Sequence, residues 1–177
     1  MFPIRRCELP AAALHGKYRV NGDYVDCYGT VIRGAVSHTQ FVEAFYTTWL
    51  FKIERLILRL LVAKPSTDED VYKLAMGQSN SFAAWSVEGR ADNQLLLCDF
   101  LGSTRSWLMV ASEDRGGGVF TRLYFGSVVV GRIDSATGER RLGLSFRLLL
   151  PFHKIYSRAL LAVAKTRITH RLSNDRS

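Results

Sequence analysis

The feature that most constrains this chain is a run of strand-like segments between residues 82 and 150 that no helical pattern interrupts. Turn residues separate these apolar segments, for example at 90–93 and 114–118. Strands joined by such short turns pair as antiparallel neighbours. The sequence therefore predicts one wide antiparallel sheet, whose last strand, GERRLGLSFRLLL, is closed by Pro151.

Elements on either side of this run complete an α+β pattern. Residues 23–34 predict a first strand, and Ser37 opens a helix that ends before Pro65, with Gln40 placed for a capping box. Thr67 begins a shorter helix, and the residues from Pro151 to Thr169 predict a terminal one. A wide sheet has an apolar face to cover, and the terminal helix is the only long element left to cover it.

Both long helices carry apolar residues at helical spacing. In the helix after Ser37 these residues form a broad face, which predicts a helix buried on more than one side. In the terminal helix, one face is predicted to lie on the sheet, formed by Phe152, Ile155, Tyr156, Ala159, Val163 and Thr166.

Four segments carry a resemblance to a known family: GDYVDCYG at 22–29, FAAWSVEG at 82–89, TRSWLMV at 104–110, and LLLPFHKIYSRALL at 148–161. Together with the order of elements, they make the chain resemble the helix-grip fold of the SRPBCC superfamily. That grouping includes START lipid-transfer domains, plant pollen-allergen proteins and aromatic polyketide cyclases. More narrowly, the sequence resembles an uncharacterised bacterial branch of it.

The resemblance implies a curved antiparallel sheet wrapped around a long C-terminal helix, with a cavity for an apolar or aromatic ligand between them. It covers residues 20–170, which are expected to form a single helix-grip domain. Residues 1–19 are expected to be an irregular leader and residues 171–177 a frayed tail. The superfamily shares no single chemistry, so the fold alone does not give the function.

Charge and hydropathy bear on the partners. The net charge is +8, and the last 27 residues hold six basic residues and one acid. This distribution argues against a nucleic-acid surface and allows weak contact between the C-terminal helix and acidic surfaces. The best candidate for a transmembrane segment, residues 41–62, carries five charged side chains and fails the test for a span.

The cysteines and histidines form neither a disulfide framework nor a metal-binding motif. Cys7, Cys27 and Cys98 are odd in number and form no CxxC pair, which predicts free thiols and a cytoplasmic protein. The four histidines lie in no HxH or HxxxH spacing. We expect neither a metal nor a cofactor.

Two residues are weak candidates for catalysis. Asp99 interrupts an apolar strand and needs a partner, for which Arg105 or Arg122 is available. His153 follows Pro151 at the start of the terminal helix, where it either moves a proton at the cavity mouth or makes local hydrogen bonds in solvent. The strand carboxylates Asp23, Asp26 and Glu88 are more simply read as surface or edge residues.

Aromatic residues spread over successive strands suggest a pocket wall. The predicted ligand-binding residues are Trp85, Arg105, Trp107, Tyr124 and Tyr156. The two tryptophans are expected to face the same space, although core packing is an equal alternative reading of the whole set.

Three functions remain open from the sequence. The first is a small-molecule binding domain, the second a cyclase- or hydratase-type enzyme that uses the same cavity, and the third an interaction protein that uses its basic helix. Two or more ionisable groups meeting inside the cavity would favour the enzyme, whereas a cavity filled by its own side chains would favour the interaction protein.

Overall fold

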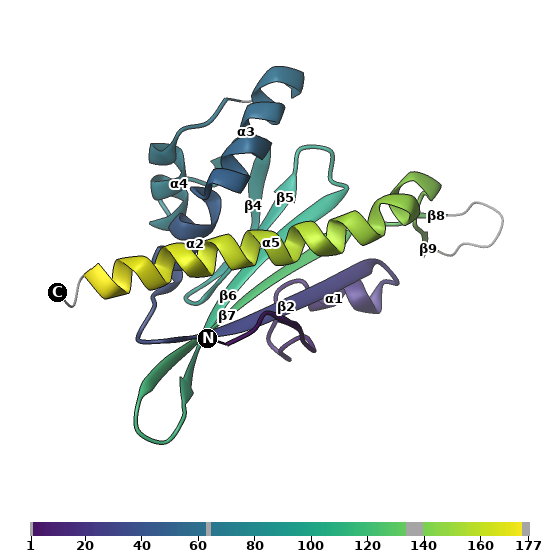
Figure 1. Cartoon of the computed structure of the whole chain (residues 1–177). Helices are drawn as coiled ribbons and strands as arrows, with labels where there is room; N and C mark the ends of the chain where they lie inside the picture. Colours follow the sequence, from purple (N-terminus) through teal and green to yellow (C-terminus); the bar gives the residue numbers. More distant parts are fainter. Residues whose placement is uncertain (1, 63–64, 134–139, 175–177) are drawn as a thin grey trace.

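The fold is built on one antiparallel sheet of seven strands with a long helix across one face (Figure 1). The structure, a computed structural model, describes residues 2–62, 65–133 and 140–174. The strands lie in the order β1-β2-β7-β6-β5-β4-β3. Their bounds are β1 Arg5–Arg6, β2 Tyr24–Arg33, β3 Ser81–Phe82, β4 Trp85–Ala91, β5 Gln94–Asp99, β6 Thr104–Asp114 and β7 Val119–Val129. The predicted α+β class and wide antiparallel sheet are confirmed.

Five helices accompany the sheet within the described ranges, namely α1 Gly16–Val20, α2 His38–Tyr46, α3 Trp49–Val62, α4 Asp68–Ala75 and α5 Leu144–Asn174. Figure 1 shows α5 running diagonally across the sheet, with α2, α3 and α4 grouped on one side of it. None of these helices is both long enough and apolar enough to cross a bilayer.

The predicted helix starts are confirmed by their caps. Ser37 accepts a hydrogen bond from the backbone of Gln40, whose side chain bonds back to the backbone of Ser37. Thr67 and Asp70 form the same capping box at α4. Each box satisfies two N–H groups that the first helical turn leaves without partners.

The predicted helix from Ser37 to Pro65 is two helices, because Thr47 and Thr48 interrupt it. The Thr47 hydroxyl donates to the Glu43 carbonyl at 2.6 Å, and the Thr48 hydroxyl donates to the Phe45 carbonyl at 2.9 Å. Thr48 Oγ1 also accepts from the backbone N–H of Phe51 at 3.2 Å. Threonine thus offers the backbone an alternative to the helical ladder and caps the next helix.

The predicted last strand is wrong. Within its span, Arg140–Arg141 form β9, which pairs with β8 at Arg132–Ile133, and α5 already begins at Leu144. The turn predicted at residues 134–138 before this strand, and residue 139, lie outside the described residues. Pro151 lies inside α5 instead of closing a strand, and it is exposed. A leucine-rich run fits a buried strand and a helix equally well, so its period did not decide between them.

The main core lies between α5 and one face of the sheet. The residues of α5 that are buried in it are Leu160, Leu161, Ala164 and Ile168. The predicted sheet-facing side of the helix is therefore wrong in part, because Phe152, Ile155 and Thr166 are exposed and Val163 is only half-buried.

A second apolar cluster lies on the opposite face of the sheet. Trp107 and Cys27 are buried there beneath the first 20 residues, which contribute Ala13 and Tyr18. The segment expected to be an irregular leader contains β1 and α1. At the other end of the chain, α5 continues to Asn174.

The three cysteines are free, as predicted. Two of them nevertheless lie side by side. Cys7 directly follows β1, and its sulfur atom lies 3.1 Å from that of Cys27 on β2. The third, Cys98, lies at the end of β5.

Candidate ligand-binding cavity

A cavity of about 700 Å³ lies between the sheet, α3 and the first half of α5. Its lining is mainly apolar and includes Phe51, Ile53, Trp85, Phe152, His153 and Tyr156. The rings of Phe152 and Tyr156 are stacked, with their centroids 6.0 Å apart. The space between sheet and helix is therefore not filled by side chains.

The sheet register places a polar row on the floor of this cavity. Ser127 on β7 lies directly opposite Ser106 on β6 and Asp26 on β2. Paired residues of adjacent strands project from the same face of the sheet, so the three side chains are neighbours on the α5 side. Ser106 and Ser127 border the cavity, and Asp26 lies behind them, with none of its side chain exposed.

Asp26 is held by donors from two other elements. The backbone N–H and the hydroxyl of Ser127 donate to its Oδ1 at 2.9 and 2.7 Å. The hydroxyl of Tyr24 donates to Oδ2 at 3.2 Å. His153 on α5 brings its Nε2 to 3.6 Å from Oδ2 and to 2.7 Å from the Ser127 hydroxyl. Residues far apart in the sequence thus form one polar network.

The hydrogen bonds of this network determine which group carries the proton. A hydroxyl has one proton, and Ser127 gives it to Asp26, so the Nε2 of His153 must be the donor in its bond to Ser127. A nucleophilic serine would instead donate to the histidine. The network therefore positions His153 and does not activate Ser127.

Asp26 is ionised in spite of its burial. Burial acts to raise the pKa of its carboxyl, but the interactions with His153 and Ser127 outweigh burial and hold the pKa below its usual range. A charged carboxylate paired in this way keeps the neighbouring imidazole oriented.

A second hydroxyl pair lies on the same floor. Tyr46 of α2 and Ser106 are joined by a hydrogen bond of 2.8 Å, and both side chains are buried. Each hydroxyl can both donate and accept, so one bond between them leaves Ser106 with further hydrogen-bonding capacity at the cavity wall.

Four of the predicted site residues line the cavity: Trp85, Arg105, His153 and Tyr156. The Trp85 Nε1–H is buried and has no hydrogen-bond partner among the described residues. His153 takes the cavity position of its two predicted alternatives, with 24% of its side chain exposed. The catalytic role of His153 stays a prediction.

Trp107 and Tyr124 do not face the cavity. Trp107 packs against His15 on the opposite face and donates from Nε1 to Gln94 at 2.9 Å. Tyr124 lies beside it, with ring centroids 6.1 Å apart. The expectation that Trp85 and Trp107 face the same space is therefore wrong.

Arg105 borders the cavity, but its guanidinium is committed elsewhere. Its Nε donates to Glu88 at 2.9 Å and to the Tyr18 hydroxyl at 2.8 Å, and Glu88 also pairs with Lys17 at 2.7 Å. This ion-pair cluster belongs to the face of the sheet that carries Trp107. It anchors α1 to the sheet and provides no charge for a ligand.

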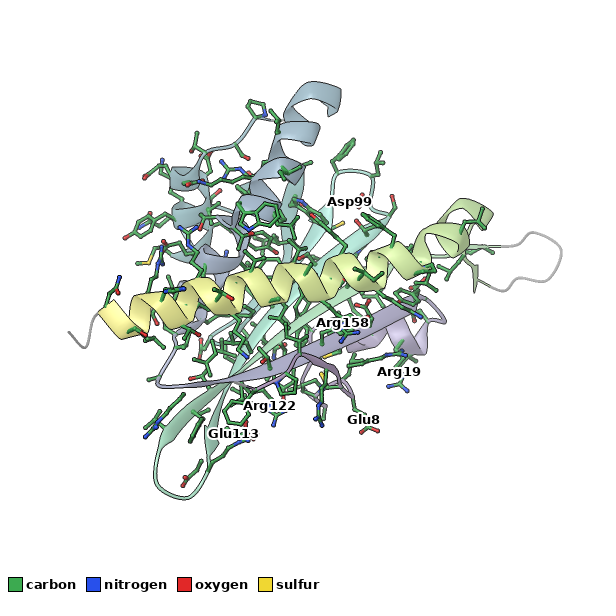
Figure 2. The ribbon with its side chains drawn as sticks, in the orientation of Figure 1. Glu8, Arg19, Asp99, Glu113, Arg122 and Arg158 are labelled. Atoms are coloured by element: carbon green, nitrogen blue, oxygen red, sulfur yellow. The ribbon has the colours of Figure 1, made fainter. Side chains whose placement is uncertain are left out.

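Asp99 stabilises a turn. Its Oδ1 accepts from the backbone N–H groups of Ser103 and Thr104 at 2.7 and 2.9 Å. Figure 2 shows Asp99 at the opposite end of the sheet from Arg122, which pairs with Glu113 at 2.8 Å. The predicted arginine partners of Asp99 are therefore wrong, and the residue caps the β5–β6 turn.

The sequence interpretation missed Asp26, Ser106, Ser127 and Tyr46 as a group. Asp26 was assigned to a surface or edge, whereas it accepts bonds from a residue 101 positions away. Strand alternation alone could have placed Ser127 with Phe125 and Leu123 on the core face. Among the described residues, no group of three or more His, Cys, Asp or Glu side chains could hold a metal ion.

Comparison with known proteins adds no family assignment. The sequence matches no protein-family model, and it matches no curated protein. The cavity and the residues that form its wall are therefore the features that bear on function.

Proposed function

We propose that this protein is a small-molecule binding domain that holds an apolar or aromatic ligand between α3, α5 and the sheet. The observation that carries the proposal is the cavity of about 700 Å³ with its mainly apolar lining. Ligand sites in proteins commonly enclose 300–1,000 Å³ and combine apolar walls with a few polar groups. Ser106, Ser127 and His153 are among the polar groups here.

The arrangement of sheet and helix supports the helix-grip assignment within this proposal. The long α5 lies across a seven-stranded antiparallel sheet, and two short helices and α3 separate β2 from the later strands. Membership of the SRPBCC superfamily, and of its uncharacterised bacterial branch, is proposed on this topology and on the four segments that resemble it. A cytoplasmic location likewise stays an expectation that free cysteines favour.

Native mass spectrometry of freshly purified protein tests the binding function. We expect a fraction of the protein to carry a bound compound of a few hundred daltons, since a cavity of this size matches such a molecule. Collision in the gas phase should release it for identification. A single apo mass, combined with no saturable binding of apolar probes, would count against the proposal.

A second candidate is an enzyme of the cyclase or hydratase type. Asp26 and His153 are two ionisable groups that meet at the cavity wall, 3.6 Å apart. A histidine oriented by a buried carboxylate can transfer a proton to or from a bound ligand. Asp99, Arg105 and Tyr124, the other polar residues considered for this chemistry, lie in the turn or are directed away from the cavity.

The two candidates differ in what happens to the bound compound. A binding domain releases the compound unchanged, whereas an enzyme converts it at a rate that falls when His153 is replaced. Incubating the released compound with the parent and with His153→Ala, followed by mass analysis, separates the two. If neither protein converts the compound, binding without catalysis is favoured.

A further inference from the structure

The side of α3 that faces away from the core carries an exposed apolar stripe. Trp49, Ile53 and Leu56 are 62, 48 and 53% exposed, and their spacing places them on one side of the helix. Phe51 and Arg55 occupy the buried side. Burial on more than one side, predicted for the helix after Ser37, is therefore found in α2, where Phe41, Val42 and Tyr46 are all buried, but not at these three residues of α3.

The first half of α5 repeats the same pattern. Leu148, Phe152 and Ile155 are 73, 66 and 68% exposed and have the same spacing as the stripe on α3. Large apolar side chains rarely gather on a protein surface unless another surface covers them.

Both stripes border the mouth of the cavity. Ile53, Phe152 and Ile155 belong to its lining. The turn between β5 and β6 adds Phe100 and Leu101, which are 50 and 71% exposed, and the residue that ends this turn, Thr104, also borders the cavity. We call the two stripes and this turn the apolar collar.

The segments that carry the stripes are strongly basic. Residues 49–62 contain three basic residues and one acid, and residues 140–158 contain five basic residues and no acid. Asp68 of α4 pairs with Lys52 and Arg55 and so offsets part of this charge. Exposed apolar side chains with basic residues beside them are typical of helices that lie in the surface of an anionic bilayer.

We propose that the apolar collar docks on an anionic lipid bilayer and places the cavity mouth against the membrane. The charge favours this occupant over a second copy of the chain, because two collars facing each other would bring two basic surfaces together. An apolar ligand then passes between bilayer and cavity without crossing water. That last step depends on the proposed binding function, whereas the docking does not.

Vesicle sedimentation with the full chain tests the docking. The protein should sediment with phosphatidylcholine vesicles that contain about 30% phosphatidylglycerol, much less with phosphatidylcholine alone, and less as salt is raised to about 0.5 M. The double variant Leu56→Asp/Leu148→Asp changes one exposed residue of each stripe that is not part of the cavity lining. It should lower the partition coefficient by at least about tenfold.

The matched control is Val20→Asp/Val119→Asp, which makes the same kind of change at residues that are 89 and 63% exposed and lie outside the collar. It should bind vesicles within about twofold of the parent after correction for its charge. Equal binding by the collar variant and this control would overturn the proposal, as would equal binding to neutral and anionic vesicles.

Analytical ultracentrifugation and a probe titration complete the test. A parent dimer that the collar variant dissociates would mean that a second copy covers the collar, which also overturns the proposal. A soluble apolar probe should bind the collar variant as it binds the parent, which shows that the variant is folded. If no form binds a probe, the proposed function fails while the vesicle result stands by itself.

Discussion

Asp26 is the residue on which the polar network of the cavity depends. Its side chain is fully buried and ionised, and three of its partners come from β2, β7 and α5. A buried charge is tolerated only when its partners replace the water that it has lost. The network therefore both fixes His153 and joins α5 to the middle of the sheet.

Replacing Asp26 with asparagine keeps the volume of the side chain but removes its charge. The NH2 group of asparagine would also face hydrogen-bond donors at a place where a carboxylate oxygen now accepts. We expect the free energy of unfolding at neutral pH to fall by about 2–3 kcal/mol. The folded-state pKa of Asp26 lies below its usual value, so its contribution is present above about pH 4 and is lost as the pH falls further. Urea titrations of parent and variant at pH 7 and near pH 3 measure this.

The difference in the free energy of unfolding between the parent and Asp26→Asn should thus shrink as the pH falls. The control is Asp92→Asn, in the exposed turn between β4 and β5, which should change stability by less than about 0.5 kcal/mol at either pH. A loss at position 26 that stays constant down to pH 3 would mean that its charge contributes nothing.

Two buried histidines should make the stability of the protein depend on pH in a different range. Burial lowers the pKa of His15 and of His38 to about 4, because the charged imidazole is poorly solvated there. The unfolded chain then binds more protons between pH 6.5 and 4, so stability should fall as the pH is lowered through this range, by up to about 3 kcal/mol for each histidine.

His38→Gln should flatten this pH dependence, whereas His170→Gln, at an exposed position on α5, should leave it unchanged. Thermal melts at half-unit steps of pH measure the slope. A parent protein whose stability does not change over this range would show that both imidazoles are accessible to water in the folded state.

At the scale of elements, α5 is the one whose packing decides the fold. Leu161 is fully buried against the sheet, and Ile155, less than two turns away, is 68% exposed. Leu161→Ala should cost about 2–5 kcal/mol because it leaves a cavity in the core, and Ile155→Ala should change stability by about 0.5 kcal/mol or less. Denaturant unfolding of the two variants shows which side of α5 covers the sheet; equal losses would contradict the observed orientation.

Pro151 is an anomaly within α5. Inside a helix, proline lacks the N–H that would bond one turn back, and its ring crowds that carbonyl, at a cost of about 3 kcal/mol. Since Pro151 is exposed, Pro151→Ala should raise the melting temperature without altering the core. A lower melting temperature would mean that the proline sets a bend on which the contacts of His153 depend.

The same elements show how far the sequence could be read. Capping boxes and hairpins were predictable, because their determinants lie within a few residues. The strand assignment at 144–150 failed because a leucine-rich run fits a buried strand and a helix equally well. Trp85 and Trp107 project from opposite faces of the sheet. Side chains alternate between the two faces along a strand, and the bulge between Val87 and Gly89 shifts this alternation in β4.

The candidate site was harder to predict than the fold for a related reason. Asp26, Ser127 and His153 lie on β2, β7 and α5, and only the register of strands about 100 residues apart brings them together. Local patterns carry no information on that register, so the sequence could nominate His153 but not its partners.

The molecule as a whole combines an apolar cavity, a polar floor and an uncovered collar around the mouth. Ligand binding and the proton-transfer alternative both depend on the cavity being open. Ala159 on α5 borders it, whereas Thr166 on the same helix is exposed. Tryptophan at position 159 should occupy the space that a ligand needs, and tryptophan at position 166 should not.

Isothermal titration calorimetry of the parent, Ala159→Trp and Thr166→Trp with a neutral aromatic probe tests whether the cavity is open. We expect saturable binding to the parent and to Thr166→Trp with micromolar affinity, about −8 kcal/mol, independent of salt. We expect at least about a tenfold loss of affinity for Ala159→Trp with an unchanged fold. Well-folded parent protein that binds no neutral probe, or an Ala159→Trp variant that binds as tightly as the parent, would contradict an open cavity.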